Sequence, residues 1–330
     1  MHSKKICMII ATLTLLLFAG SALAGPIVIK FSHVVAENTP KGQMANHFKK
    51  LIQERLGDDK VVVEVYPNSQ LFNDNKVLSA MLLGDVQLAA PALSKFQKYT
   101  NVLQLYDLPF LFKDMDEVEK FQQGEYGQKM LKSMEDKGFT GLGYLHNGMK
   151  QLSASEPLRV PEDAAGKKFR IMTSDVLAAQ FEAVDAVPLK KPFSEVFTLL
   201  QTNAIDGQEN TWSNIYSKKF FEVQKYITES NHGLLDYMVV TSTEFWNSMP
   251  GDIRKEVEMA LTEAINFGNA ISFKKAQEDK QKIIDSGRSE VILLTPEQRA
   301  KWVKAMKPVW DQFKDDIGPE YVDAAANIGN

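Results

Sequence analysis

The chain has 330 residues, of which 44% are hydrophobic and 24% charged, and its formal net charge is −4 at pH 7. This composition is typical of a globular protein and excludes disordered and collagen-like chains, and no basic stripe indicates a nucleic-acid partner. Because single hydrophobic cores stop growing at about 250–300 residues, the length favours two lobes.

The first 24 residues have the pattern of a secretory signal peptide. MHSKK is a short basic start, ICMIIATLTLLLFAG is apolar, and Ala22-Leu23-Ala24 supplies small residues for cleavage. We expect cleavage after Ala24 and a periplasmic location. An uncleaved membrane anchor is the alternative, which the short apolar run disfavours because a span needs about 20 residues. A lipoprotein is disfavoured too, because Cys7 lies at the start of the apolar run.

Cleavage would change the chemistry of the mature chain. Cys7 is the only cysteine, so the mature protein would contain no disulfide and no thiol nucleophile. Lys4 and Lys5 would leave with the peptide, which moves the formal charge from −4 to −6.

Strand and helix patterns alternate from the start of the mature chain. Strands are expected at 27–35, 61–67 and 86–93, and helices at 40–56, after the Thr39-Pro40 capping pair, and at 75–83. This order predicts an α/β lobe with mainly parallel strands.

The alternation resumes after residue 140. Strands are expected at 141–145, 167–172, 186–190, 204–210, 227–230 and 236–242, and helices at 174–184 and 193–203. A helical pattern from 250 to 286 would reach about 50 Å, longer than one lobe. Its apolar spacing does not hold a heptad, so we expect one helix lying across both lobes rather than a coiled coil. A further helix capped by Thr295-Pro296 is expected to hold Trp302 and Trp310.

The sequence gives little support for catalysis. It contains no G-x-S-x-G elbow and no H-E-x-x-H motif, and its five histidines are scattered. The segment GLGYLHNG (141–148) has G-x-G without the third glycine of a dinucleotide loop, and a strand ending in a turn explains it. We expect no enzyme activity, no cofactor and no metal site.

Cationic and amide side chains occur where strands of the second half end. Arg170 lies between Phe169 and Ile171, Lys150 follows the Gly148 turn, and Asn210 ends the strand at 204–210. Ligands of open α/β sheets bind beyond the carboxyl ends of strands, and a guanidinium pairs bidentately with a carboxylate. Together the three residues indicate an anion site. From position alone, Arg170 could equally be held by an internal carboxylate, and Lys150 could be a plain surface lysine.

Several linked segments resemble one protein family. HNGMKQLSASEPLRVPEDAAGKKFRIM, PFSEVFTLLQTNAIDGQEN and SKKFFEVQKYITESNH, with FSHVVAENTPKG and VYPNSQLFND near the start, look like the solute-binding subunits of TRAP (tripartite ATP-independent periplasmic) transporters. The similarity covers essentially the whole mature chain. It is greatest to the DctP type, which captures C4-dicarboxylates.

The resemblance implies roles for individual residues. The arginine of the family's G-x-K-x-R strand is Arg170, which would clamp a ligand carboxylate, and the asparagine of D-G-Q-E-N is Asn210, which would donate to the same group. Lys150 stands where the family often has an arginine and lacks its bidentate fork. Phe193 resembles the aromatic residue that packs on the ligand, and His33 matches a position at the cleft mouth.

The remaining candidates match the family pattern less closely or belong to the first lobe. Trp212 stands near a position where the family often has proline, and it would narrow the pocket. Lys41, Ser94 and Lys95 are the candidates for a distal carboxylate. Two buried carboxylates each need a cation or several donors. Arg170 can serve one end and Lys150 with Lys41 or Lys95 the other, an arrangement that a neutral sugar would not need.

The expected architecture is an α/β, two-lobed periplasmic binding protein of type II-like form, with a hinge that includes the long helix. Lobe I would comprise 25–148 and 236–275, and lobe II 149–235 and 276–330. The family implies a small and a large integral membrane subunit as partners. The alternatives are a binding protein for another organic anion, such as a sugar acid or 2-oxo acid, and a receptor that reports ligand to a signalling partner. An exported hydrolase is disfavoured because nucleophile and metal motifs are missing.

Overall fold

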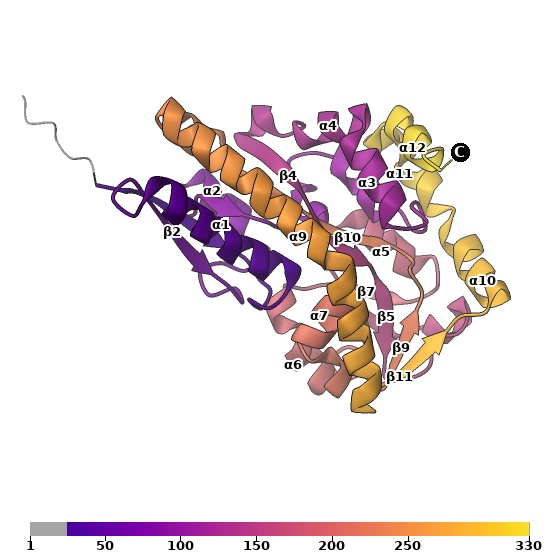
Figure 1. The fold of residues 1–330 in the computed structure, drawn as a ribbon. Helices are drawn as coiled ribbons and strands as arrows, with labels where there is room; N and C mark the ends of the chain where they lie inside the picture. Colours follow the sequence, from indigo (N-terminus) through magenta and orange to yellow (C-terminus); the bar gives the residue numbers. More distant parts are fainter. Residues whose placement is uncertain (1–24, 330) are drawn as a thin grey trace, which may run out of the picture.

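Two β-sheets and a long helix organise the molecule (Figure 1). The computed structural model describes residues 25–329, so the expected signal peptide lies outside the described residues. We call the five-stranded sheet with its covering helices lobe I, and the six-stranded sheet with its helices lobe II. The expected two-lobed α/β architecture is confirmed.

The lobe I sheet has the strand order β2-β1-β3-β10-β4. Strands β1, β2 and β3 are parallel, whereas β10 runs antiparallel to both of its neighbours. The strands are β1 (Ile27–Ser32), β2 (Val61–Tyr66), β3 (Leu88–Ala89), β4 (Phe139–Met149) and β10 (Leu234–Ser242). The expectation of mainly parallel strands therefore holds for the first part of this lobe only.

The lobe II sheet has the order β11-β9-β5-β8-β6-β7. Strand β6 is parallel to β7 and β8, and β5 is antiparallel to β8 and β9. The strands are β5 (Gln151–Ala154), β6 (Lys168–Ile171), β7 (Val187–Lys190), β8 (Gly207–Asn210), β9 (Tyr226–Glu229) and β11 (Glu290–Leu293). The chain passes between lobes from β4 to β5 and returns from β9 to β10, so these two crossings connect the lobes.

Helices cover both sheets. The α-helices are α1 (Pro40–Leu56), α2 (Val77–Leu82), α3 (Met115–Gln123), α4 (Glu125–Leu131), α5 (Asp175–Glu182), α6 (Val196–Gln201), α7 (Trp212–Ser217), α8 (Thr243–Ser248), α9 (Gly251–Ser286), α10 (Pro296–Met306), α11 (Val309–Ile317) and α12 (Pro319–Ala326). Short 3₁₀ helices are η1 (Leu93–Phe96), η2 (Val102–Asp107), η3 (Glu135–Lys137), η4 (Pro161–Ala164), η5 (Phe193–Glu195) and η6 (Phe220–Glu222). Within residues 25–329, no helix has both the length and the apolar character needed to cross a bilayer.

The capping pattern before α1 works as the sequence indicates. The Thr39 hydroxyl accepts from the backbone N–H of Gly42 at 3.2 Å, and Pro40 occupies the first helical position, where no N–H is needed. Gly57 ends the helix with a positive φ of 76°. This cap fixes the position of Lys41, which lies in the first turn of the helix and points into the protein.

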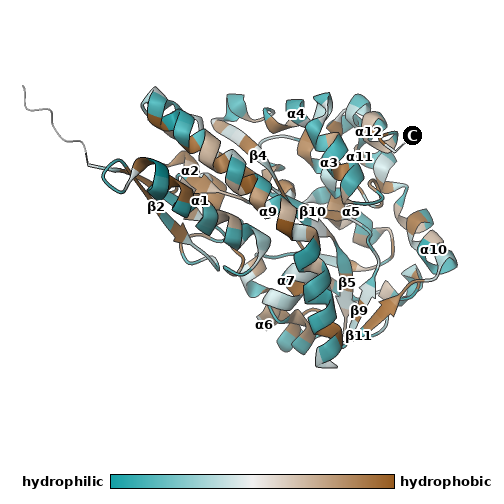
Figure 2. Ribbon diagram, in the orientation of Figure 1, coloured by the Kyte–Doolittle hydropathy of each residue, from teal (hydrophilic) through white to brown (hydrophobic). Residues whose placement is uncertain are grey.

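Helix α9 joins the lobes. Its N-terminal half packs on α1 and β4 of lobe I, and it also packs on α7 of lobe II. Figure 1 shows it running the length of the molecule, and Figure 2 shows its outer side as largely hydrophilic. Thirty-six residues correspond to about 54 Å, and the predicted helix across both lobes is confirmed.

The C-terminal segment differs from the expectation. Trp302 and Trp310 lie on separate helices, α10 and α11, because Pro308 interrupts the pattern. Helices α11 and α12 then return to lobe I and pack on η2, and the Trp310 indole donates to the Pro109 carbonyl at 2.8 Å. Helix α11 also packs on α5 of lobe II, so the last part of the chain contacts both lobes, and the assignment of 276–330 to lobe II stays a prediction.

Gly207, the glycine of D-G-Q-E-N, provides a test of packing in lobe II. A Cβ there would lie 2.4 Å from the Ser153 carbonyl oxygen and 2.5 Å from the Phe169 ring. We expect Gly207→Ala to lower the free energy of unfolding by about 1–3 kcal/mol in urea denaturation. Gly251→Ala is the control, because a Cβ there meets nothing within 4 Å. Equal stability of the two variants would contradict the packing described here.

Candidate functional site

A cavity lies between the lobes, beyond the carboxyl ends of β1, β3, β6 and β8, where open α/β sheets bind ligands. Lobe I contributes the turn after β1, the first turn of α1, the segment before α2 and part of β10. Lobe II contributes the ends of β6 and β8 with η5 and α7. The polar or aromatic lining residues are Ser32, His33, Lys41, Phe72, Asp74, Arg170, Phe193, Asn210, Asn214 and Tyr237.

Arg170 is the cation that lobe II brings to this cavity. Its side chain is only 1% exposed, although it lies on a strand between two apolar residues. Nε donates to the Lys191 carbonyl at 2.9 Å, whereas Nη2 is buried without a hydrogen-bond partner among the described residues. Burial lowers the pKa of Arg170, but a guanidinium stays charged in proteins. The group therefore presents unused N–H donors and a positive charge.

Lys41 is the corresponding cation of lobe I. It is 1% exposed, and its Nζ donates to the Ala90 carbonyl at 2.7 Å and lies 3.3 Å from the centre of the Tyr237 ring. It forms no ion pair with a carboxylate in the part of the chain that the structure describes. Burial lowers the pKa of Lys41 well below its ordinary value. An anion in the cavity would stabilise the ammonium.

Asp74 connects the two sides of the cavity. Its carboxylate lies 2.9 Å from Lys95 Nζ in lobe I, accepts from the Phe193 backbone N–H at 3.2 Å, and lies 3.8 Å from Arg170 Nη2. Burial raises the pKa of Asp74, but the charges of Lys95 and Arg170 outweigh it, so the net direction is down. Asp74 is thus an anion already matched by Lys95.

His33 is the neutral polar group of the lining. It is 2% exposed, and neither ring nitrogen has a hydrogen-bond partner among the described residues. Burial, helped by the charge of Lys41, lowers its pKa to about 3. At neutral pH the ring therefore offers one donor and one acceptor and no charge.

The comparisons with known proteins identify the family. Residues 31–316 match the model of the DctP family, described as bacterial extracellular solute-binding protein, family 7. The chain belongs to this family. A Shewanella loihica protein named C4-dicarboxylate-binding periplasmic protein DctP is 67% identical over 322 residues, which cover 98% of this chain and 96% of that protein.

Solved structures agree in fold. A TRAP periplasmic solute-binding protein of Shewanella oneidensis with bound succinate has 62% identity and a TM-score of 0.92, with 93% of this chain and 100% of that chain covered. One from Pseudomonas aeruginosa with bound L-malate has 44% identity and a TM-score of 0.85, with coverage of 87% and 100%.

Five of the residues that the DctP-family resemblance singles out meet at the cavity. They are His33, Lys41, Arg170, Phe193 and Asn210. The guanidinium carbon of Arg170 lies 5.8 Å from the centre of the Phe193 ring, so the aromatic ring flanks the cation. Ligand contact by these five stays a prediction.

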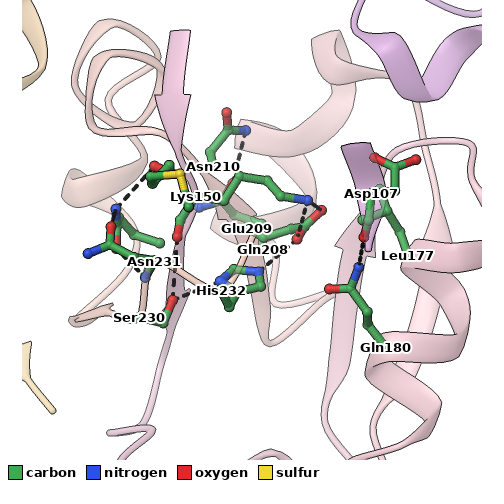
Figure 3. Close-up of polar contacts among 12 residues, drawn as sticks. Asp107, Lys150, Leu177, Gln180, Gln208, Glu209, Asn210, Ser230, Asn231 and His232 are labelled. Atoms are coloured by element: carbon green, nitrogen blue, oxygen red, sulfur yellow. Dashed lines mark hydrogen bonds and ion pairs between the residues drawn. The ribbon is translucent and has the colours of Figure 1, made fainter. Parts of the chain in front are cut away.

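Lys150, another residue that the resemblance singles out, does not line the cavity of this DctP-family protein. It is fully buried at the crossing from β4 to β5, and its Nζ lies 2.8 and 2.9 Å from the two carboxylate oxygens of Glu209 (Figure 3). The other neighbour of Glu209 is His232 Nε2, at 2.9 Å. Burial raises the pKa of Glu209, but the Lys150 charge and the His232 hydrogen bond bring it down to about 2. This ion pair occupies the lysine, so we exclude it from the proposed ligand contacts.

Ser94, Lys95 and Trp212 do not line the cavity either. Ser94 donates to Asp107 at 2.6 Å, and Lys95 is engaged by Asp74 and Asn75. Trp212 packs into an apolar cluster of lobe II. Sequence reasoning missed five polar or aromatic lining residues instead: Ser32, Phe72, Asp74, Asn214 and Tyr237. Only for Asn214 does the sequence give an indication of a place in the site, because Asn214 follows Asn210 by one helical turn.

The Lys150–Glu209 pair gives a stability test. Lys150→Met leaves a buried carboxylate without its cation, so we expect a loss of about 3–5 kcal/mol in the free energy of unfolding at pH 7. Removing both charges in Lys150→Met/Glu209→Leu should recover most of that loss, as measured by urea denaturation. A double variant no more stable than the single one would show that the pair is not the main interaction of Lys150.

Proposed function

We propose that this DctP-family protein captures a C4-dicarboxylate, such as succinate, malate or fumarate, in the cavity between its lobes. The observation that carries the proposal is a pair of buried cations, Arg170 and Lys41, one from each lobe. Asp74 is matched by Lys95 and His33 is neutral, so the Arg170 guanidinium and the Lys41 amine, which a bound anion would keep protonated, remain for a ligand with two carboxylates. The 67% identical relative is named for this ligand class, and the 62% identical structure contains succinate.

The two ends of the ligand meet different partners in this proposal. One carboxylate binds the free N–H groups of Arg170 and the amide of Asn210, with Phe193 packing beside it. The other binds Lys41 and Tyr237. Tyr237 accepts from Asn147 at 2.7 Å and keeps its own O–H as a donor. A dianion bridging the lobes stabilises the closed arrangement, because only that arrangement satisfies both carboxylates.

Delivery to a membrane permease completes the proposed function. TRAP-family relatives imply a small and a large integral membrane subunit as partners, and the protein works in the periplasm after signal-peptide cleavage. The chain itself catalyses no reaction. Sugar acids and 2-oxo acids remain alternative ligands, which the binding experiments below separate. A signalling partner remains the alternative to a permease, and neighbouring genes for two membrane subunits would favour transport.

Arg170 is the first residue to test. We expect Arg170→Ala to weaken binding of succinate and malate at least tenfold in isothermal titration calorimetry, because a carboxylate loses its charged partner. Arg159→Ala is the matched control, since Arg159 lies on the surface of lobe II and pairs with Glu290 at 3.6 Å. Unchanged affinity of Arg170→Ala would contradict the assignment.

A ligand panel tests the substrate class. The mature protein is screened by thermal shift against C4-dicarboxylates, monocarboxylates, sugar acids and 2-oxo acids. A ligand at 100 times its dissociation constant stabilises by about 2.7 kcal/mol, and we expect only the dicarboxylates to do so. Stabilisation by monocarboxylates or sugar acids alone would refute the dicarboxylate proposal while leaving the family unaffected.

Direct contacts between the lobes also close the cleft. Lys218 donates to the Asn68 side chain at 2.9 Å, and Thr173 donates to Asn75 at 3.2 Å. At the start of α5, the Asp175 N–H donates to the Gln97 side chain at 2.8 Å, and the Gln97 amide donates back to the Asp175 carboxylate. Neither Gln97 nor Asp175 lines the cavity, so this pair influences closure and not ligand contact.

Removing the Gln97–Asp175 contact should accelerate ligand release. We expect Gln97→Ala to raise the dissociation rate about fivefold and to leave the association rate unchanged, since the contact exists only after closure. Stopped-flow fluorescence with succinate measures both rates. Gln43→Ala is the control, because Gln43 is a surface glutamine that bonds within lobe I, to Asn38. Identical release from both variants would contradict a closing role.

A further inference from the structure

A chain of side-chain hydrogen bonds in lobe II ends at the cavity, at Asn214. The Asn214 amide Nδ2 donates to Asn210 Oδ1 at 2.7 Å, and Asn210 Nδ2 donates to Gln208 Oε1 at 3.2 Å. Farther from the cavity, Gln208 Nε2 donates to Ser153 Oγ at 2.8 Å, and Ser153 Oγ donates to Gln224 Oε1 at 3.0 Å. Asn210 and Asn214 both line the cavity.

Backbone groups fix the direction of this chain. At the far end, Gln224 Nε2 donates to the Val223 carbonyl, which can only accept. Near the cavity, the Thr211 N–H, which can only donate, points to Asn210 Oδ1 at 3.3 Å. Turning any amide over would place two donors or two acceptors against each other. The orientation of Asn210 and Asn214 is therefore determined.

This orientation gives the two asparagines opposite roles. Asn210 uses its oxygen internally and keeps one N–H for the cavity, which suits a carboxylate. Asn214 uses its N–H internally, and its Oδ1 is a buried acceptor with no hydrogen-bond partner among the described residues. Asn214 is 3% exposed, and an unsatisfied buried acceptor is costly.

A ligand with carboxylates alone cannot satisfy that acceptor. Succinate and fumarate dianions have only acceptor oxygens, whereas a 2-hydroxy dicarboxylate also carries an O–H donor next to one carboxylate. Asn210 and Asn214 present a donor and an acceptor one hydrogen bond apart, which matches a carboxylate oxygen and the adjacent hydroxyl. His33, whose neutral ring also has an unused acceptor nitrogen, adds a second group of this kind.

We propose that Asn214 determines ligand preference by accepting a hydrogen bond from the hydroxyl of a 2-hydroxy C4-dicarboxylate, so that malate binds more tightly than succinate or fumarate. The inference rests on the proposed function and specifies the ligand within it. Its test distinguishes the two, because failure of every dicarboxylate to bind overturns the proposed function, whereas equal binding of malate and succinate overturns only this inference.

The unmodified protein gives the first test. Dissociation constants are measured by titration calorimetry for succinate, fumarate, both enantiomers of malate and both enantiomers of 2-methylsuccinate, in which a methyl group replaces the hydroxyl. We expect one malate enantiomer to bind at least tenfold tighter than succinate and than the matching 2-methylsuccinate. Affinities of malate and succinate within twofold of each other would overturn the proposal and indicate that a trapped water serves Asn214.

The variant Asn214→Leu then assigns the effect to one residue. We expect malate to lose at least tenfold in affinity and succinate less than threefold, so that the preference disappears. Asn147→Leu is the matched control, because Asn147 is also buried and bonded to Tyr237 but does not line the cavity. It should leave the malate-to-succinate ratio unchanged. Equal losses for both ligands in Asn214→Leu would overturn the proposal. If that variant does not fold, the ligand series on the unmodified protein decides the proposal by itself.

Discussion

The rest of the site depends on one constraint. The charged Arg170 side chain is buried, and it needs an anion close by. A guanidinium that is 1% exposed keeps its charge, so the fold has to supply negative charge or accept it from a ligand. Asp74 from lobe I supplies part of it, at 3.8 Å, but its nearer partner is Lys95. In the proposed function, closure of the lobes and capture of a carboxylate would be coupled through one side chain, since both bring negative charge to Arg170.

A second set of buried charges lies where the chain crosses between the lobes. Lys150 lies where β4 leaves lobe I, its backbone N–H donates to Gly233 where the chain returns, and its ammonium pairs with Glu209 of lobe II. His232, on the returning segment, bonds to the same carboxylate, and Figure 3 shows the three side chains converging. The pair ties both crossings to β8, whose end carries Asn210. The same strand therefore contacts both crossings through Glu209 and presents Asn210 to the cavity.

Much of the fold and part of the site could be predicted from local patterns in the sequence. The Thr39-Pro40 cap, the long helix and the strand ends that carry Arg170 and Asn210 depend on neighbours in the chain, and the structure has them where expected. The ion pair of Lys150 could not be predicted from the sequence, because its partner Glu209 is 59 residues away and becomes adjacent only through antiparallel pairing of β5 with β8. Tyr237 lies inside the pattern of a buried strand, and Asp74 lies in a loop. In neither case does the local sequence indicate that the side chain faces the cavity. The return of α11 and α12 to lobe I likewise depends on tertiary contacts of apolar faces.

The most direct test of this account is a crystal structure of the mature protein with bound L-malate or succinate. The account predicts a closed protein in which one carboxylate contacts the Arg170 guanidinium and the Asn210 amide, while the other contacts Lys41. Lys150 should remain paired with Glu209. A ligand bound outside this cavity, or one whose carboxylates avoid Arg170, would contradict the account.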